Sequence, residues 1–266
     1  MSTALRIVLT GASSGIGREL ARQFGARGAR LVLAARSESR LEAVARESLE
    51  LGAASAFVVP TDVTSQPDCA ALIDRAAGVL GGVDVLINNA GVSQWARFDE
   101  ITDLSVFERL MRVNYLGAVW CTHAALPHLA ASRGRIVAVS SLAGLTGVPT
   151  HSGYAATKHA MTGFFESLRV ELAEAGVTVT LVHPGFVSSD IRRNALGPDG
   201  TALEGKAVRE GRVMSTEECA RRIVRATLRR DRQVVMTWRG KVGRWAKLVA
   251  PGIVDRIAAR AIRTGE

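Results

Sequence analysis

The sequence of 266 residues has few cysteines and no long apolar run. Its three cysteines, Cys69, Cys121 and Cys219, lie far apart with neither metal-ligand nor redox spacing. We therefore expect no metal site, and reduced, buried thiols in a reducing compartment. No apolar run approaches the roughly 18 residues that cross a bilayer, and the first strand pattern begins almost at Met1. These absences predict a soluble, cytoplasmic protein without a signal peptide.

Acidic residues are scarce in the last part of the chain. The net charge is +9, but from Arg229 onward there are ten Lys or Arg and three Asp or Glu, against twenty-four and twenty-two before it. The main body is therefore close to neutral, and the basic surplus belongs to the C-terminal tail. This distribution argues against a nucleic-acid-binding protein.

Apolar residues make up 47% of the chain and charged residues 22%, which excludes a disordered protein. Short apolar runs alternate with helical patterns, which indicates βαβ units and a parallel sheet covered on both faces. The predicted strands are Ile7–Leu9, Leu31–Ala34, Phe57–Val59, Val83–Ile87, Arg135–Val139, Val177–Val182 and Gln233–Thr237. The sequence therefore predicts an α/β fold, a Rossmann-like doubly wound parallel sheet flanked by helices, with ligands at the carboxyl ends of the strands.

No repeat or linker divides the chain, so we expect one dinucleotide-binding and catalytic domain over residues 1–238. Residues 185–213 form the longest irregular stretch and are expected to be a mobile loop over the site. Residues 239–266 read as a basic amphipathic helical tail. Such segments more often pack on their own protein or on a second subunit than on an anionic membrane, so packing is the prediction and peripheral membrane contact the alternative.

The first predicted strand ends in a glycine-rich turn, Thr10-Gly-Ala-Ser-Ser-Gly-Ile-Gly17, that opens a helix. Gly11 permits the tight turn, Gly15 lets the backbone approach a pyrophosphate, and Gly17 allows close packing of helix on strand. The helix N-terminus then faces negative charge. Strand before and helix after favour a dinucleotide site over a merely structural turn.

The residues after the second strand indicate which dinucleotide is bound. A site that prefers NAD places an acid there to accept from the ribose hydroxyls. This chain has Ala35, followed by Arg36 and Ser37, whose charge and donors suit a 2′-phosphate. The sequence therefore predicts NADP(H), against the alternative that Arg36 is a solvated surface charge.

Tyr154 and Lys158 share one face of a predicted helix, because they are four residues apart. A phenol is a poor base at neutral pH, and a fixed cation beside it favours the phenolate and lowers its pKa. Ser141, after the fifth strand, supplies a hydroxyl that holds the oxygen of a carbonyl or alcohol. Such a group is a proton-transfer site, although a Tyr and a Lys at this spacing are usually ordinary helix surface.

Together these residues resemble the short-chain dehydrogenase/reductase family over roughly residues 5–237. The resemblance lies in the glycine-rich turn, Asn88-Asn-Ala-Gly91, Asn114, Ser141, the Tyr-x-x-x-Lys pair and Pro184-Gly185, in the order and spacing of the family. Arg36-Ser37 and the stretch Leu49–Ala56 are similar to members near the 11β-hydroxysteroid dehydrogenases, some of which carry an N-terminal anchor that we do not expect here. Ser189 stands where the family often has Thr, and it keeps the hydroxyl.

The resemblance implies an enzyme that acts on CH–OH groups with NADP(H). Tyr154 is the implied general acid/base, Lys158 lowers its pKa and holds the nicotinamide ribose, Ser141 orients the substrate oxygen, and Asn114 supports a lysine–water proton relay. The expected cofactor contacts are Gly11, Ser13, Ser14, Gly15, Ile16, Gly17, Arg36, Ser37, Asp62, Val63, Asn89, Ala90, Gly91, Tyr154, Lys158, Pro184, Gly185, Val187 and Ser189. The family also implies a homodimer or homotetramer.

Residues flanking these motifs are expected to line an apolar substrate pocket: Gln94, Trp95, Leu142, Val148, His151 and Phe186. The predicted function is interconversion of a carbonyl and a secondary alcohol on a small, hydrophobic substrate. One alternative is a 3-oxoacyl-thioester reductase. Another, from a different class, is a non-catalytic dinucleotide-binding sensor or scaffold, which would be expected to lose Ser141 or the Tyr154–Lys158 pair.

Overall fold

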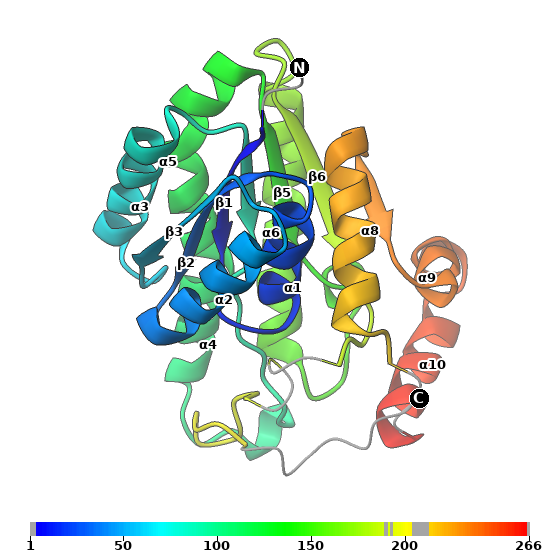
Figure 1. The fold of residues 1–266 in the computed structure, drawn as a ribbon. Coiled ribbons are helices and arrows are strands. Elements are labelled where there is room, and N and C mark those ends of the chain that lie inside the picture. The colour runs from blue at the N-terminus through cyan, green and yellow to red at the C-terminus, as the bar shows by residue number, and fades with distance from the viewer. Residues whose placement is uncertain (1–3, 189–190, 192–193, 204–212, 265–266) are drawn as a thin grey trace.

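Seven parallel strands form one sheet in the order β3-β2-β1-β4-β5-β6-β7 in a computed structural model that describes residues 4–188, 191, 194–203 and 213–264. The strands are β1 Arg6–Thr10, β2 Arg30–Ala35, β3 Ser55–Pro60, β4 Val85–Asn88, β5 Arg135–Val139, β6 Thr178–His183 and β7 Gln233–Val235. The chain order reverses between β1 and β4, which is the switch point where such sheets bind ligands. The prediction of a doubly wound parallel sheet is confirmed (Figure 1).

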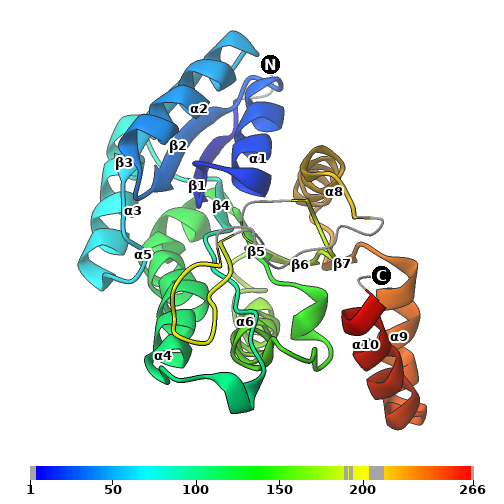
Figure 2. The ribbon, with the colours of Figure 1, turned by 90° about the horizontal axis from the view of Figure 1, so that it is seen from below.

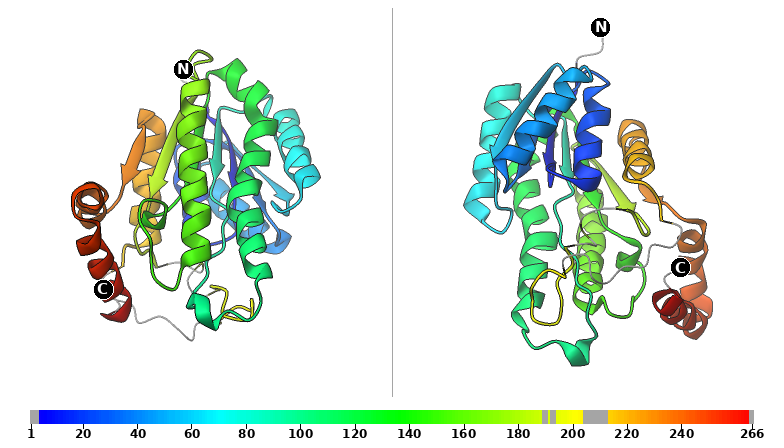
Figure 3. Two further views of the ribbon diagram at one scale, coloured as in Figure 1. Left: turned by 180° about the vertical axis from the view of Figure 1, so that it is seen from behind. Right: turned by 60° about the horizontal axis from the view of Figure 1, so that its bottom comes forward.

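Helices cover both faces of the sheet (Figures 1 and 3). One face carries α1 Gly15–Gly25, α2 Glu38–Glu50 and α8 Thr216–Arg229, and the other carries α3 Gln66–Leu80, α5 Gly117–Ser132 and α6 Ser152–Glu171. The other helices named in the described residues are α4 Ser105–Met111, the short turns η1 Phe98–Glu100, η2 Arg112–Leu116 and η3 Leu142–Gly144, and the tail helices α9 Trp238–Val249 and α10 Pro251–Thr264.

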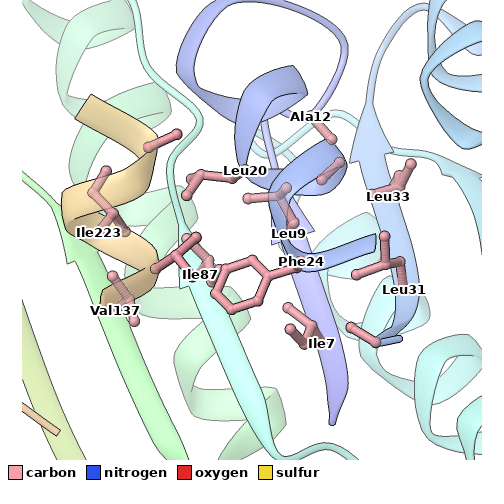
Figure 4. Packing of buried hydrophobic residues seen from close by; sticks show 14 of the residues in the cluster. Ile7, Leu9, Ala12, Leu20, Phe24, Leu31, Leu33, Ile87, Val137 and Ile223 are labelled. Atoms are coloured by element: carbon pink, nitrogen blue, oxygen red, sulfur yellow. The ribbon is translucent and has the colours of Figure 1, made fainter. Parts of the chain in front are cut away.

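Alternation along each strand produces two hydrophobic cores, because neighbouring side chains point to opposite faces. Ile7 and Leu9 of β1 pack under α1, against Leu20 and Phe24 (Figure 4), whereas Val8 packs into the core beneath α3, α5 and α6. All five side chains are essentially fully buried. The sheet is therefore held from both sides, and its carboxyl-end edge is left to loops (Figure 2).

The segment after β6 is partly anchored where it is described. The Leu196 backbone donates to Ser93 and accepts from the Trp95 amide, at 2.9 Å each, and Pro198 accepts from the Thr102 amide at 2.9 Å. These bonds join residues 194–203 to the chain that leaves β4. The predicted mobile loop therefore includes a section bound to the body, and its other residues lie partly outside the described ranges.

Candidate active site

A cavity of about 1590 Å³ lies at the carboxyl ends of the strands. That is more than the roughly 300–1,000 Å³ of a typical small-molecule pocket, so a dinucleotide and a second molecule fit together. All the predicted cofactor contacts within the described residues line it; Ser189 lies outside them. The switch-point position and the glycine-rich turn thus meet in one continuous site.

The glycine-rich turn is shaped by close backbone approach. Gly11 and Gly15 have φ values of +66° and +52°, in the left-handed region that favours glycine. A Cβ on Gly17 would lie 2.0 Å from the Gly11 carbonyl oxygen, so α1 packs directly on the turn. The Asn89 amide donates to the Thr10 and Gly11 carbonyls at 3.1 Å each and clamps the turn to the end of β4. The turn is thus held rigid.

The N-termini of α1 and α2 both face the cavity. Each is preceded by a serine, Ser14 or Ser37, whose side chain makes no capping hydrogen bond. Helix N-termini carry partial positive charge and unpaired amides, which suit phosphate. The two ends therefore offer separate phosphate positions, one beside the glycine-rich turn and one beside Arg36.

A second arginine joins Arg36 at the N-terminus of α2. Arg40, three residues after Ser37, also lines the cavity. The sequence analysis did not identify Arg40. A helix that begins directly after Ser37 places Arg40 in its first turn, beside the predicted phosphate site, and this was the signal available. Asp62 lines the cavity as expected, and its carboxylate accepts from the Thr64 amide at 2.9 Å and from the Thr64 hydroxyl at 2.8 Å.

Ser141, Tyr154 and Lys158 converge on the cavity from two elements. Ser141 begins η3 directly after β5, and its hydroxyl favours a lower pKa for Tyr154. Tyr154 lies in the first turn of α6, and the Lys158 ammonium lies one turn further, 5.6 Å from the Tyr154 ring centre. The ammonium donates to the Val139 carbonyl at 2.9 Å. The predicted group is therefore assembled.

Burial, and not the attraction between Tyr154 and Lys158, sets the pKa values of these two residues in the protein without ligands. Burial raises the pKa of Tyr154 to about 12, and the hydrogen bond with Ser141 offsets only part of this. Burial lowers the pKa of Lys158 to about 7. Lys158 does not contribute to the pKa of Tyr154 in the chain without ligands, and the expectation that it lowers this pKa stays a prediction for the enzyme with its cofactor bound. At neutral pH the phenol is protonated and is ready to donate.

We expect Lys158 to make the cofactor-free protein more stable as the pH rises from about 7 towards 10. Its folded pKa, about 7, is below its usual value near 10.5, so the unfolded chain binds more protons across that window. The free energy of unfolding should therefore rise there by up to about 1.4 kcal/mol per pH unit, relative to Lys158→Met. Urea unfolding of both proteins from about pH 6 to 9.5, below the titration of Tyr154, measures this. If the free energy of unfolding changes with pH in the same way in both proteins, the lowered pKa of Lys158 is contradicted.

Asn114 is completely buried and lies in η2, a π-helical turn between α4 and α5. Its amide oxygen accepts from the Val92 amide at 2.8 Å, and its amide nitrogen donates to the Val92 carbonyl at 2.9 Å and to the Thr157 hydroxyl at 3.0 Å. The side chain therefore joins the chain after β4 to the helix that carries Tyr154. Its expected part in a proton relay stays a prediction, and the geometry gives the side chain a positioning role.

His183 supports Ser141 from behind. Its Nδ1 lies 3.0 Å from the Ser141 carbonyl, and its Nε2 accepts from the Gln233 amide at 2.9 Å. Gln233 in turn accepts from Arg244 of α9 at 2.7 Å. Burial lowers the pKa of His183 to about 4, so the ring is neutral and its Nδ1 carries the proton. The tail is thus connected to the backbone of the site serine.

Five of the six predicted substrate-pocket residues line the cavity: Trp95, Leu142, Val148, His151 and Phe186. The Trp95 and His151 rings meet edge to face with centres 4.8 Å apart, next to Tyr154. Gln94 is the exception. It is fully buried, and its side-chain oxygen accepts from the Gly153 amide at 2.9 Å. Because that bond fixes the start of α6, Gln94 supports the site from outside the cavity, and its expected place in the pocket is wrong.

Residues of the tail and the two residues directly before it also line the cavity. They are Thr237, Trp238, Gly240, Val242, Gly243, Arg244, Ala246, Ile253, Val254 and Ile257. Two amphipathic helices follow the last strand (Figure 2), and their residues thus form one wall of the site. Among the described residues, no group of His, Cys, Asp and Glu is arranged to hold a metal ion. No helix in the described ranges is long and apolar enough to span a membrane.

The known proteins that this chain resembles are dehydrogenases. A family model described as short chain dehydrogenase matches residues 6–198. The chain is 38% identical to 11-beta-hydroxysteroid dehydrogenase A of Sesamum indicum over 254 residues, covering 94% of this chain and 73% of that protein. It is 42% identical to 11-beta-hydroxysteroid dehydrogenase-like 3 of Arabidopsis thaliana over 185 residues, covering 70% and 60%. An alcohol dehydrogenase from the archaeon Thermococcus sibiricus, solved with 5-hydroxy-NADP, superimposes with a TM-score of 0.75 at 26% identity, covering 87% of this chain and 94% of that one.

Proposed function

This chain belongs to the short-chain dehydrogenase/reductase family and is an oxidoreductase acting on CH–OH groups, and on that premise we propose that it uses NADP(H) to interconvert a carbonyl and a secondary alcohol on a small, hydrophobic substrate. One observation carries the proposal: Ser141, Tyr154 and Lys158 share a cavity with a glycine-rich dinucleotide turn. A non-catalytic scaffold has no need of a protonated phenol aimed into such a cavity.

The residues fit a phosphorylated nicotinamide dinucleotide. The glycine-rich turn, on which α1 packs closely at Gly17, leaves room for phosphates, and the two uncapped serines offer hydrogen-bond donors to them. Arg36 and Arg40 add positive charge where a 2′-phosphate is expected. The last residue of β2 is Ala35, where a site that prefers NAD has a carboxylate. When bound, the reduced nicotinamide supplies a hydride to the carbonyl carbon.

The chain's own groups handle the proton. The Ser141 hydroxyl hydrogen-bonds the substrate oxygen, and Tyr154 Oη donates its proton to that oxygen as it gains negative charge. Lys158 lies one helical turn behind Tyr154 and is placed to hold the ribose of the cofactor and to stabilise the phenolate that remains. In the oxidative direction the phenolate takes the proton back from the alcohol. Atoms and charge balance, because one hydride and one proton convert the carbonyl to the alcohol.

The apolar residues of the cavity favour a hydrophobic substrate. Leu142, Val148, Phe186 and the tail residue Ile253 line the cavity that holds the catalytic hydroxyls, and Trp95 and His151 give one aromatic side. Following NADPH oxidation with a panel of cyclic ketones, aliphatic ketones and 3-oxoacyl thioesters tests the proposal. Turnover of ketones supports it. Turnover of thioesters alone favours the 3-oxoacyl-thioester alternative, and no turnover of any carbonyl, with NADPH bound, favours a sensor.

Arg36→Ala is expected to weaken NADPH binding by about 10- to 100-fold, because a charge-assisted hydrogen bond to phosphate contributes about 1.5–3 kcal/mol. NADH binding should change less than about twofold, since NADH lacks the 2′-phosphate. Arg40→Ala should act in the same direction. Fluorescence titration with both cofactors measures the dissociation constants.

The matched control for this pair is Arg18→Ala. Arg18 lies on α1, forms an ion pair with Glu47 at 2.6 Å and does not line the cavity, so its loss should leave both affinities unchanged. Equal affinity for NADH and NADPH in the parent protein, unaltered by Arg36→Ala, would refute the phosphate site.

A further inference from the structure

The two tail helices stand as a pair at the edge of the sheet (Figures 2 and 3). α9 packs on β7, and α10 packs on α9. α9 is fixed to the body on its polar side: Arg244 donates to Gln233 at 2.7 Å, and Lys247 donates to the Leu145 carbonyl at 3.3 Å. The helix therefore has a defined orientation, and one side of it is turned away from the protein.

Large apolar side chains of both tail helices are exposed. Trp238, Trp245, Leu248, Val249, Ile253 and Ile257 are each more than half exposed, and we call these six residues the tail surface. Trp238, Trp245 and Val249 fall at helical spacing along α9. Single exposed apolar residues are ordinary, but six on two adjacent helices form a patch that marks an interaction site. The structure leaves these six side chains exposed, and packing of the tail on its own protein or on a second subunit stays a prediction.

Basic residues are interspersed along the chain with those of the tail surface. Residues 238–264 contain seven Lys or Arg against one acidic residue, Asp255. Lys241 and Arg256 are exposed, and the Arg244 guanidinium stacks on Trp245, 4.9 Å from its ring. Tryptophan and leucine on one side of a helix with lysine and arginine beside them are the pattern of helices that lie in a membrane interface. Anionic lipid headgroups attract each such cation near the surface by about 1 kcal/mol.

A second copy of the chain fits this surface less well. A two-fold symmetric contact brings the same patch of both subunits together, so Lys241, Arg244 and Arg256 of one tail would come close to those of the other. Like charges brought together in this way oppose association. An anionic surface removes the conflict, because it neutralises the cations while the apolar side chains leave water.

The tail surface is continuous with the cavity. Trp238, Ile253 and Ile257 belong to the tail surface and also line the site. We propose that the α9–α10 tail surface docks on an anionic lipid bilayer and that a hydrophobic substrate passes from the bilayer into the cavity beside it. The delivery step rests on the proposed function, whereas docking does not and is tested without any turnover.

Co-sedimentation with vesicles tests docking. We expect the protein to sediment with vesicles of phosphatidylcholine mixed with phosphatidylglycerol in low salt, and far less with phosphatidylcholine alone. About 1 M NaCl, where the screening length is about 3 Å, should weaken binding. Leu248→Glu combined with Val249→Glu should lower the partition coefficient by more than about tenfold, because two apolar side chains leave the interface and two negative charges meet the lipid. Neither residue lines the cavity.

The matched control is Val170→Glu. Val170 and Leu248 are each 74% exposed, but Val170 lies on α6, near the end of the helix opposite to Tyr154. This variant should bind vesicles like the parent. Thermal unfolding checks that all variants fold. If the double variant does not fold, Lys241→Glu with Arg256→Glu replaces it, and this variant should also lose binding to anionic vesicles.

Three results overturn the proposal. The first is no co-sedimentation with anionic vesicles in low salt, and the second is equal loss of binding in Val170→Glu and in the tail variant. The third is a dimer in solution that the tail variant dissociates while vesicle binding is absent, which would make the tail surface a contact between subunits. Retained ketone turnover beside absent vesicle binding would overturn docking alone and leave the proposed function intact.

Discussion

Tyr154→Phe is expected to lower kcat/KM for ketone reduction by about a thousandfold, within the 10²–10⁴ range for loss of a general acid. The variant keeps the ring, which packs beside His151 and above Lys158, and removes only the hydroxyl that donates the proton. Burial holds the pKa of Tyr154 at about 12, so the phenol is protonated throughout the neutral range. We therefore expect the loss of activity in Tyr154→Phe to be the same at every pH in that range. Steady-state NADPH oxidation measures the effect, and fluorescence titration checks that NADPH still binds.

Tyr115→Phe is the matched control for this prediction. Tyr115 is the other tyrosine of the chain; it packs edge to face on Phe164 and does not line the cavity. The same chemical change at Tyr115 should leave kcat/KM within about twofold, as expected of a substitution away from the reacting atoms. Full activity in Tyr154→Phe would remove the phenol from the mechanism, and an equal loss in both variants would show a general effect on packing.

Gly17→Ala is expected to destabilise the cofactor-free protein by about 3 kcal/mol, at the upper end of the usual cost of overpacking. The added methyl group would lie 2.0 Å from the Gly11 carbonyl oxygen and 2.7 Å from the Asn89 side chain, and the first of these is backbone that cannot turn aside. The turn that receives the pyrophosphate must then shift, so NADPH binding should fall with stability. Urea unfolding gives the free energy, and titration with NADPH gives the affinity.

Gly78→Ala is the control for a change of glycine to alanine inside a helix. Gly78 lies on the exposed side of α3, and a Cβ there meets nothing within 4 Å. Alanine has the higher helix propensity, so this variant should be stabilised by about 0.5–1 kcal/mol. If Gly17→Ala is as stable as Gly78→Ala and binds NADPH normally, the close approach of α1 to the turn is not required.

Much of the site could be predicted because its chemistry is local in the sequence. The Gly11–Gly17 turn, the Arg36-Ser37 pair and the Tyr154–Lys158 spacing each lie within one strand–helix junction or one helical turn. Parallel strands bring their carboxyl ends to one edge, so residues that follow different strands were expected to meet, and those within the described residues do line one cavity. Gln94 shows the limit of this reasoning. Its neighbour Trp95 lines the cavity, and only the fold decides which of two adjacent residues points outward.

The sequence by itself determined the order of strands and helices, the glycine-rich turn, and the residues that meet at the end of the sheet, because periodicity and spacing act over a few residues. The tertiary structure decided the rest. It turned Asn114 into a support between Val92 and Thr157, and it set the pKa values of Tyr154 and Lys158 by burial. It also placed the tail helices against the cavity with their apolar side exposed. These outcomes depend on which distant groups pack together and how much water they exclude, and no local pattern records that.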